Sequence, residues 1–522
     1  MRNAGPRRRD VLLAGAVAVM LPPRLGRAAG NSITVVLESE VTILDPHYTT
    51  ANITRNFGYH VFDMLFAMDS KGDIQPQMVE RHEVSTDGLR WHFILRDGLA
   101  FHDGAPVTAT DCVASLRRWA PRDSLGRMLV TVLDDIRAED ERNFTITLKA
   151  PFPLMLQALG KPNAPVPFIM PTRIVAAAGD GRISEITGSG PFRFRKEAWR
   201  AGDTMLLSRF EQYQPRGGKP DFLAGGKTVH IDELVLKVVP DDATAANALM
   251  AGEIDYMQYL PFDLLATLEK SEGVQLMNFS GLDMFQGNFR VNHASGPFAD
   301  PAVRAVLWKL VDQREILGAI GIPERFGMTV CDSFWLCGTP LATDAGAEVA
   351  KFDVAAAKAA LAKTSYKGEP VVILQVSGSI STTASKVLTQ HMREAGFTVD
   401  EQVMDWGTLL ARRAKKDGWS LFGVYSNGVD MDSPLTHFYV SNNCADYPGW
   451  NCSEAMTGLL RDFAAAPDDA VRKRVAADIQ VEAYRQTPSV MWGQFSRPAG
   501  YRSRLKNMIQ SSFPMFWEVE IT

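Results

Sequence analysis

The chain has 522 residues, with 55 basic and 60 acidic side chains and a net charge of −5 when the histidines are neutral. Residues 1–29 hold six arginines and one aspartate, so the remainder carries a net charge of −10 without a basic tract, which argues against a nucleic acid as partner. The roughly 490 residues after position 29 are too many for one hydrophobic core and predict two or three domains.

The N-terminal segment has the order of a signal peptide. Arginines at positions 2 and 7–9 precede an apolar run at 11–21, and small residues follow at 26 and 28–30. The run is too short to span a membrane, and cleavage is expected after Ala28 or Ala29. Arg8-Arg9 resembles a twin-arginine signal, with a Sec signal as the alternative, while the apolar run disfavours a disordered basic tail. We predict a signal peptide over 1–29 and a periplasmic protein exported by Tat or Sec.

Apolar patterns in the N-terminal half predict mixed strands and helices. Strands are expected at 32–37, 143–148, 188–194 and 231–239, and a loop at 44–48 leads into a helix through about residue 65. Residues 58–187 mix short strands with short helices. An alanine-rich helix is expected at 241–251, and Gly252-Glu253-Ile254-Asp255 ends it and opens a short strand.

The pattern changes after residue 300. Helices are predicted at 301–310, 352–362, 385–395 and 406–416, and strands at 371–376 and 398–404 lie between them. A long helix at 470–486 precedes a last strand at 489–492. Alternating helices and strands predict an α/β lobe with a largely parallel sheet.

Residues 89–111 are the most informative stretch. A half-buried strand pattern runs through Trp91, turns follow at Asp97-Gly98 and Asp103-Gly104, and a helix begins near Thr108. The order W-x-F-x-L-R-x-G-x-x-F-H-D-G-x-P-x-T-A-x-D closely resembles the signature of the bacterial extracellular solute-binding proteins of family 5. Members of that family deliver peptides and related solutes to ABC importers.

The resemblance extends along nearly the whole chain after the signal peptide. It includes the Gly188-Ser189-Gly190-Pro191-Phe192 turn and the segments 239–255, 288–304 and 406–413. It implies an α/β fold of the two-lobe periplasmic-binding (Venus-flytrap) type with an extra subdomain. Lobe I would comprise 30–57, 188–282 and 490–522, the inserted subdomain 58–187, and lobe II 283–489. The lobes would close on a ligand, with hinges at Phe285, Arg290, Trp492 and Phe495.

The resemblance also suggests ligand contacts. Peptide receptors of this family bind the α-ammonium with an aspartate four positions before a proline, and counting back from Pro434 gives Asp430, with Asp432 as a second candidate. As an alternative, both aspartates are turn residues that cap the next helix. Trp406 would stack on the ligand backbone or anchor the start of a helix. Residues Tyr48, Thr49 and Thr50 would offer hydrogen bonds or be ordinary loop residues. No basic residue is assigned to a peptide carboxylate.

The cysteine spacing is consistent with export. Cys331 and Cys337 flank one short loop and Cys444 and Cys452 flank another, so we predict two local disulfides in an oxidising compartment. Cys112 would remain unpaired as a small buried hydrophobe. A four-cysteine zinc site is the alternative, but neither pair has C-x-x-C spacing, so no metal site is predicted.

The leading function is therefore a periplasmic receptor that captures a di- or oligopeptide and hands it to an inner-membrane ABC permease complex. The same fold could instead bind a nickel chelate, haem, an opine or an oligosaccharide. A secreted hydrolase with two carboxylates is the third possibility, but no G-x-S-x-G, H-E-x-x-H or P-loop motif is present in the sequence. We expect no enzyme activity, no cofactor, and a monomer.

Overall fold

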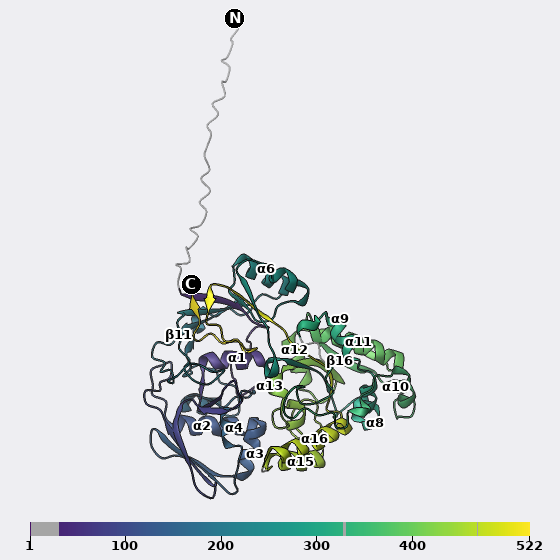
Figure 1. Ribbon diagram of the computed structural model, residues 1–522, viewed down its shortest axis with the longest axis horizontal. Coiled ribbons are helices and arrows are strands. Elements are labelled where there is room, and N and C mark those ends of the chain that lie inside the picture. Colours follow the sequence, from purple (N-terminus) through teal and green to yellow (C-terminus); the bar gives the residue numbers. More distant parts are fainter. Residues whose placement is uncertain (2–30, 327–329, 467) are drawn as a thin grey trace.

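The computed structural model describes residues 1, 31–326, 330–466 and 468–522. The predicted signal peptide, residues 1–29, lies outside the described residues apart from Met1. Two lobes lie side by side, one purple to teal and the other mostly green, and the C-terminal end returns to the first (Figure 1). In the described ranges, no helix combines the length and apolar character needed to cross a lipid bilayer.

Lobe I is built on a seven-stranded mixed sheet. The order is β10-β11-β12-β1-β13-β20-β14, and the strands are β1 (Ser32–Val36), β10 (Phe192–Phe194), β11 (Thr204–Arg209), β12 (Glu233–Lys237), β13 (Tyr256–Met257), β14 (Val274–Met277) and β20 (Ala499–Arg502). The central strand β1 runs parallel to β12 and β13, and its last four residues are buried, as a continuous apolar run requires. Helices α1 (Asn52–Val61), α6 (Asp242–Ala251) and α7 (Leu265–Leu268) belong to this lobe, which ends in the pair β21 (Leu505–Lys506) and β22 (Glu520–Ile521).

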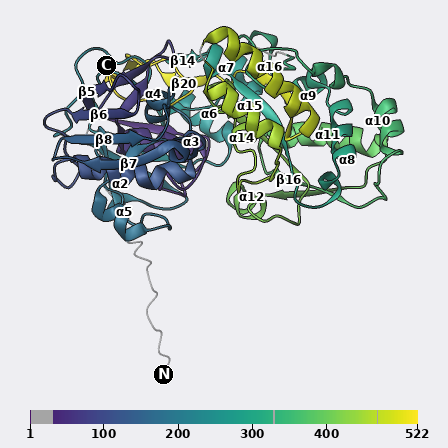
Figure 2. The same ribbon diagram turned by 90° about the horizontal axis from the view of Figure 1, so that it is seen from below.

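The inserted subdomain is a four-stranded antiparallel sheet with helices. The sheet order is β5-β6-β8-β7, with β5 (Val79–Val84), β6 (Arg90–Leu95), β7 (Leu133–Ala138) and β8 (Asn143–Leu148). Its side formed by α3 (Ser124–Val132) lies next to lobe II (Figures 1 and 2), where Ser124 donates to the Leu435 carbonyl at 3.0 Å and Arg127 donates to Asn442 Oδ1 at 2.8 Å. Helices α2 (Ala109–Trp119), α3 (Ser124–Val132), α4 (Met155–Gly160) and α5 (Thr172–Ala178) accompany it, as do the pairs β2 (Asp63–Met64) with β9 (Phe168–Ile169) and β3 (Phe66–Met68) with β4 (Ile74–Pro76).

The 89–111 motif joins this subdomain to lobe I through His102. The His102 ring contacts Gly190 O through Nε2 at 3.0 Å and accepts from the Gly188 amide through Nδ1 at 3.3 Å. Burial lowers the pKa of His102 to about 4, so the ring is neutral and can accept at Nδ1. Gly190 has no side chain because a Cβ there would lie 2.7 Å from the His60 carbonyl oxygen. The 89–111 motif and the 188–192 turn therefore pack against each other at one junction.

Lobe II is built on a five-stranded sheet, and the prediction of a largely parallel sheet is wrong for half of it. The order is β17-β16-β18-β15-β19, with β15 (Phe285–Val291), β16 (Val371–Val376), β17 (Val399–Met404), β18 (Leu421–Asn427) and β19 (Ser489–Phe495). Strand β16 is parallel to β17 and β18, whereas β15 is antiparallel to both β18 and β19. Helix–strand alternation in the sequence describes only β16 to β18, because β15 and β19 come from the two ends of the lobe.

Lobe II contains nine α-helices within the described residues. They are α8 (Pro301–Ala305), α9 (Gln313–Ile320), α10 (Val354–Leu361), α11 (Ile380–Ala395), α12 (Trp406–Arg413), α13 (Gly428–Met431), α14 (Phe438–Ser441), α15 (Glu454–Ala464) and α16 (Asp469–Gln486). The long helices α15 and α16 lie side by side at one face of the lobe in both views (Figures 1 and 2). Buried apolar residues of α11, such as Leu388 and Met392, face the core beneath the sheet.

The change of lobe near residue 490 lies later than the sequence predicted. All of β19 pairs with β15 in the lobe II sheet, so residues 490–495 belong to lobe II. The four residues predicted as hinges, Phe285, Arg290, Trp492 and Phe495, lie inside these two strands. Strand β15 is paired on both edges, and a paired strand cannot absorb a large dihedral change without losing hydrogen bonds. The chain crosses between the sheets at 278–284 and 496–498 instead.

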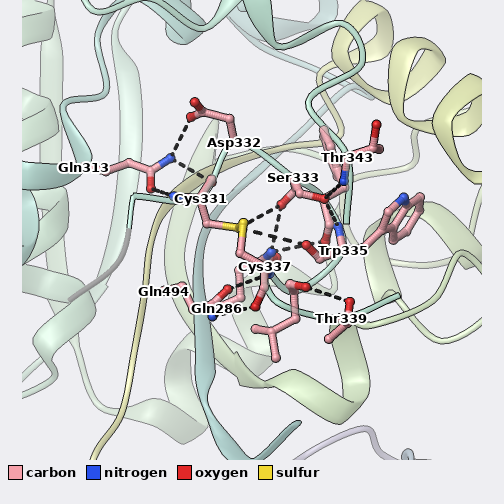
Figure 3. The surroundings of a disulfide bond; sticks show 12 residues. Gln286, Gln313, Cys331, Asp332, Ser333, Trp335, Cys337, Thr339, Thr343 and Gln494 are labelled. Carbon is pink, nitrogen blue, oxygen red and sulfur yellow. Dashed lines mark hydrogen bonds between the residues drawn. A yellow bond between two sulfur atoms is a disulfide. The ribbon is translucent and has the colours of Figure 1, made fainter. Parts of the chain in front are cut away.

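Both predicted disulfides are confirmed. Cys331 pairs with Cys337 and Cys444 with Cys452, while Cys112 is free and buried. Glutamine side chains hold the first disulfide at both ends (Figure 3). Gln313 accepts from the Cys331 amide at 2.8 Å and donates to its carbonyl at 3.0 Å, and Gln494 of β19 does the same for Cys337 at 2.8 and 3.1 Å. The disulfide loop is therefore fixed to the edge of the lobe II sheet.

Candidate functional site

A cavity of about 420 Å³ lies between the two lobes. Lobe I lines it with residues at the ends of β1 and β13 and the starts of α1 and α6, and lobe II with the loop after β16, strand β18, and residues of α12 and α14. Its lining is Val36, Leu37, Glu38, Ser39, Thr50, Ala51, Asn52, Ile53, Pro240, Asp241, Asp242, Met257, Tyr259, Val376, Ser377, Gly378, Ser379, Ile380, Ser381, Trp406, Arg413, Gly423, Val424, Tyr425, Ser426, Phe438, Tyr439, Tyr447 and Arg497. The volume falls within the range of small-molecule sites.

Helix α12 presents Trp406 and Arg413 to the cavity. Asp405 starts the helix by accepting from the Thr408 amide at 2.9 Å, which places Trp406 in its first turn. Arg413 follows seven residues later, two helical turns along the same face. Its guanidinium lies 5.6 Å from the centre of the Trp406 ring and 5.5 Å from that of Phe422, within cation–π range. The lobe II side of the cavity is thus an aromatic surface with a cation beside it.

Arg497 lies in the short crossover and reaches the cavity from the hinge side. Its guanidinium lies 4.6 Å from the centre of the Tyr259 ring, and Nη1 donates to the Tyr425 hydroxyl at 2.9 Å. Asp242 lies 4.0 Å from Nη2. Arg497 is 7% exposed, so its contacts connect lobe I, lobe II and the crossover at one buried point.

Glu38 is the acidic residue at the carboxyl end of β1. Its amide donates to the Gln258 side chain at 3.1 Å, which fixes the backbone where the strand leaves the sheet. Burial raises the pKa of Glu38, while the charges of Arg497 and Arg55 lower it to a smaller extent. Ligands in open α/β sheets bind outside the carboxyl ends of the strands, and Glu38 occupies that position.

Trp406 and Thr50 are the predicted ligand residues that line the cavity. Tyr48 and Thr49 do not line it. The Tyr48 ring is 49% exposed and lies 5.6 Å from the Arg182 guanidinium, and the Thr49 hydroxyl accepts from the Ala51 amide at 3.1 Å. Their side chains therefore stabilise the loop before α1.

The structure places Asp430 in a buried ion pair instead of the cavity. Arg55 of α1 donates through Nη1 to both Asp430 carboxylate oxygens at 2.8 and 2.9 Å, and Asn163 donates to one of them at 2.9 Å. The Arg55 and Asp430 side chains are 1% and 0% exposed. Asp430 is fully buried in this pair and is not part of the cavity lining, so the structure shows an interlobe contact where the sequence predicted an ammonium contact.

Asp432 also lies outside the cavity lining. It is half-buried, and Oδ1 accepts from the Thr436 hydroxyl at 3.2 Å. Burial, with a smaller contribution from the neighbouring Asp430 charge, raises the pKa of Asp432 to about 7. Its hydrogen bond to Thr436 agrees with the alternative reading of a turn residue before α14.

Sequence reasoning did not identify Glu38, Arg413 and Arg497. The seven-residue spacing from Trp406 could have indicated Arg413, because both residues occur on one face of a predicted helix. No local pattern could have indicated Glu38 or Arg497, which are separated by more than 450 residues and meet only when β20 returns to lobe I.

Comparison with known proteins identifies relatives along the whole chain. The family model described as bacterial extracellular solute-binding proteins, family 5 middle, matches residues 73–446. A Sinorhizobium fredii protein named probable peptide ABC transporter periplasmic-binding protein is 33% identical over 98% of this chain and 99% of its own length. The glutathione-binding protein of Escherichia coli O6:K15:H31 is 25% identical over 83% of this chain and 82% of its own.

Solved structures share the fold. A periplasmic binding protein of A. tumefaciens R10, in complex with agropinic acid, has a TM-score of 0.79 at 23% identity and covers 94% of this chain and 99% of its own. A periplasmic binding protein of Helicobacter pylori, in complex with the peptide STSA, has a TM-score of 0.78 at 18% identity and covers 94% and 98%. At these identities the likeness concerns the fold, and it confirms the predicted two-lobe class.

Proposed function

Because the chain belongs to the bacterial extracellular solute-binding proteins of family 5, we propose that it is the periplasmic receptor of an ABC importer and that its ligand is a peptide. The interlobe cavity of about 420 Å³ is the observation that carries this proposal. Its lining combines aromatic rings, charged side chains and hydroxyl groups, which together suit a peptide backbone and termini. The name of the Sinorhizobium fredii relative supports the same ligand class.

The proposed activity is capture without chemical change. A ligand that contacts both lobes favours the closed state by its differential affinity for that state over the open one. The closed receptor would then deliver the peptide to an inner-membrane permease complex. We propose that the protein acts as a monomer in the periplasm, reached through the Tat or Sec route, and that it has no catalytic residues.

The motion would be a hinge rotation at the two crossovers. Segments 278–284 and 496–498 are the connections between β14 and β15 and between β19 and β20, and hinge motions fall on such short inter-element segments. The Arg55–Asp430 ion pair lies beside the first crossover, because α13 follows β18 and the Gly428 amide donates to the Met284 carbonyl at 2.6 Å. We infer that this pair stays formed while the far ends of the lobes move.

A thermal-shift screen of the mature protein tests the ligand class. A panel of di-, tri- and longer peptides would be compared with an opine, an oligosaccharide and a nickel–histidine chelate. A peptide at one hundred times its Kd adds about 2.7 kcal/mol, which raises the Tm of a chain of this length by about 2–3 °C. Stabilisation by non-peptide solutes alone, or sustained hydrolysis of a bound peptide, would overturn the proposal. Small-angle scattering of the stabilised complex should show compaction.

A further inference from the structure

Five charged side chains line the interlobe cavity, and three of them have partners. Asp241 caps α6 and accepts from the Thr244 amide at 2.7 Å and its hydroxyl at 2.6 Å. Asp242 and Arg497 lie 4.0 Å apart, and Arg497 also donates to the Tyr425 hydroxyl. These groups already have charge or hydrogen-bond compensation inside the protein.

The other two charged side chains are Glu38 and Arg413. Within the part of the chain that the structure describes, neither side chain forms a hydrogen bond or an ion pair within 4.0 Å. Arg413 lies over the faces of Trp406 and Phe422, and these cation–π contacts leave its N–H groups available as donors. Glu38 is half-buried, and a partly desolvated carboxylate without a close partner is costly unless a cation is supplied.

The two charges lie on opposite lobes. Glu38 follows β1 of lobe I, and Arg413 ends α12 of lobe II. A ligand that carries both a cation and an anion can satisfy them together only when the lobes are close. That arrangement supplies the differential affinity which closure requires. The aspartate that family resemblance would assign to the cation, Asp430, is occupied by Arg55.

We propose that the cavity binds a short peptide as a zwitterion, with its α-ammonium at Glu38 on lobe I and its α-carboxylate at Arg413 on lobe II. This inference rests on the proposed function, because it takes a peptide as the ligand. The bidentate geometry of guanidinium and carboxylate suits Arg413 to the C-terminus. Burial raises the pKa of Glu38, so a bound ammonium would also stabilise the ionised carboxylate.

The test removes each charge from the peptide and from the protein in turn. The probe is the peptide of the screening panel that raises the Tm most, used free, in a desamino form and as the C-terminal amide. Neither change adds much bulk, so each affinity loss reports the missing charge. Isothermal titration calorimetry compares the wild type with Glu38→Gln and Arg413→Gln. The matched controls are Glu253→Gln and Arg461→Gln, whose side chains are exposed outside the cavity on lobes I and II.

We expect the desamino peptide to bind the wild type about thirty-fold or more weakly than the free peptide. In Glu38→Gln the Kd of the desamino peptide should lie within about twofold of the Kd of the free peptide. In Arg413→Gln the Kd of the C-terminal amide should lie within about twofold of the Kd of the free peptide. In the control variants, the desamino peptide and the C-terminal amide should each lose as much affinity relative to the free peptide as they do in the wild type. Circular dichroism and Tm establish that the variants fold. Folding is expected because neither side chain forms a hydrogen bond within the described ranges.

The outcomes separate the two proposals. If no peptide of the panel binds the wild type, the proposed function fails and this inference fails with it. Peptides could bind while Glu38→Gln still binds the desamino peptide much more weakly than the free peptide, or while Arg413→Gln still binds the amide much more weakly than the free peptide. Either result would overturn only the present assignment. Equal binding of free and charge-deleted peptides by the wild type would overturn it as well.

Discussion

Replacing Asp430 with asparagine tests the reassignment of this residue from ligand contact to interlobe ion pair. The substitution keeps the shape of the side chain and leaves the buried Arg55 guanidinium without its carboxylate. Breaking a buried pair from one side costs about 3–5 kcal/mol. Unfolding entropy scales with chain length, so for roughly 490 residues this loss corresponds to a Tm lower by about 3–5 °C. Differential scanning calorimetry of the mature protein measures the change.

Two further variants separate the ion pair from a general effect of substitution. Asp432→Asn changes a half-buried aspartate two residues away and should not destabilise the protein at neutral pH, because burial already raises the pKa of Asp432 to about 7. The double variant Arg55→Met with Asp430→Leu removes both charges and should recover most of the loss, since apolar side chains of similar volume can replace a buried pair.

Ligand binding supplies the result that would refute this reasoning. Asp430→Asn should still discriminate between the free and desamino peptides as the wild type does, even if both bind more weakly. An unchanged Tm together with loss of that discrimination would show that Asp430 binds the ligand ammonium. The family-based prediction would then be right, and the ion pair with Arg55 would contribute little to stability.

Three other predictions concern stability. The folded pKa of Asp432, about 7, lies above its ordinary value near 4. The stability of the wild type relative to Asp432→Asn should therefore be greatest below pH 4 and should fall as the pH rises through 7. A difference in stability that does not depend on pH would contradict this prediction. Gly190→Ala should cost about 1–3 kcal/mol in denaturant unfolding because the new Cβ meets a carbonyl at 2.7 Å, while the matched Gly217→Ala, with no atom within 4 Å, should cost nothing. Replacing Cys331 and Cys337 together with serine should cost about 2 kcal/mol by the loop-entropy relation for a sequence separation of 6, and a wild-type Tm would refute that contribution.

Local sequence patterns predicted many elements of the fold. The strand 143–148 matches β8, the strand 371–376 matches β16, and the helix 470–486 is α16 within one residue. These segments have strong apolar periodicity, so their own side chains decide their conformation. The two cysteine pairs were equally local, because short loops bring their sulfurs together whatever surrounds them.

Errors arose where pairing partners come from distant segments. The strand predicted at 489–492 corresponds to β19 (Ser489–Phe495), but it ends three residues later, is followed by β20 to β22, and was placed partly in the wrong lobe, because only the sheet shows that β19 pairs with β15. The residues predicted as hinges lie close to a boundary in the sequence, whereas in space they lie within the paired strands β15 and β19 of the lobe II sheet.

The sequence by itself determined the family, the two-lobe class and the disulfides, because motif spacing and apolar periodicity are properties of neighbouring residues. Only the tertiary structure decided which charges remain for a ligand. Asp430 is neutralised by Arg55, 375 positions earlier in the chain, while Glu38 and Arg413 form no ion pair within 4.0 Å among the described residues, and the charges of Arg497 and Arg55 act on Glu38 only from a greater distance. The availability of a charged group depends on what folding brings within a few ångströms of it, and local sequence does not contain that information.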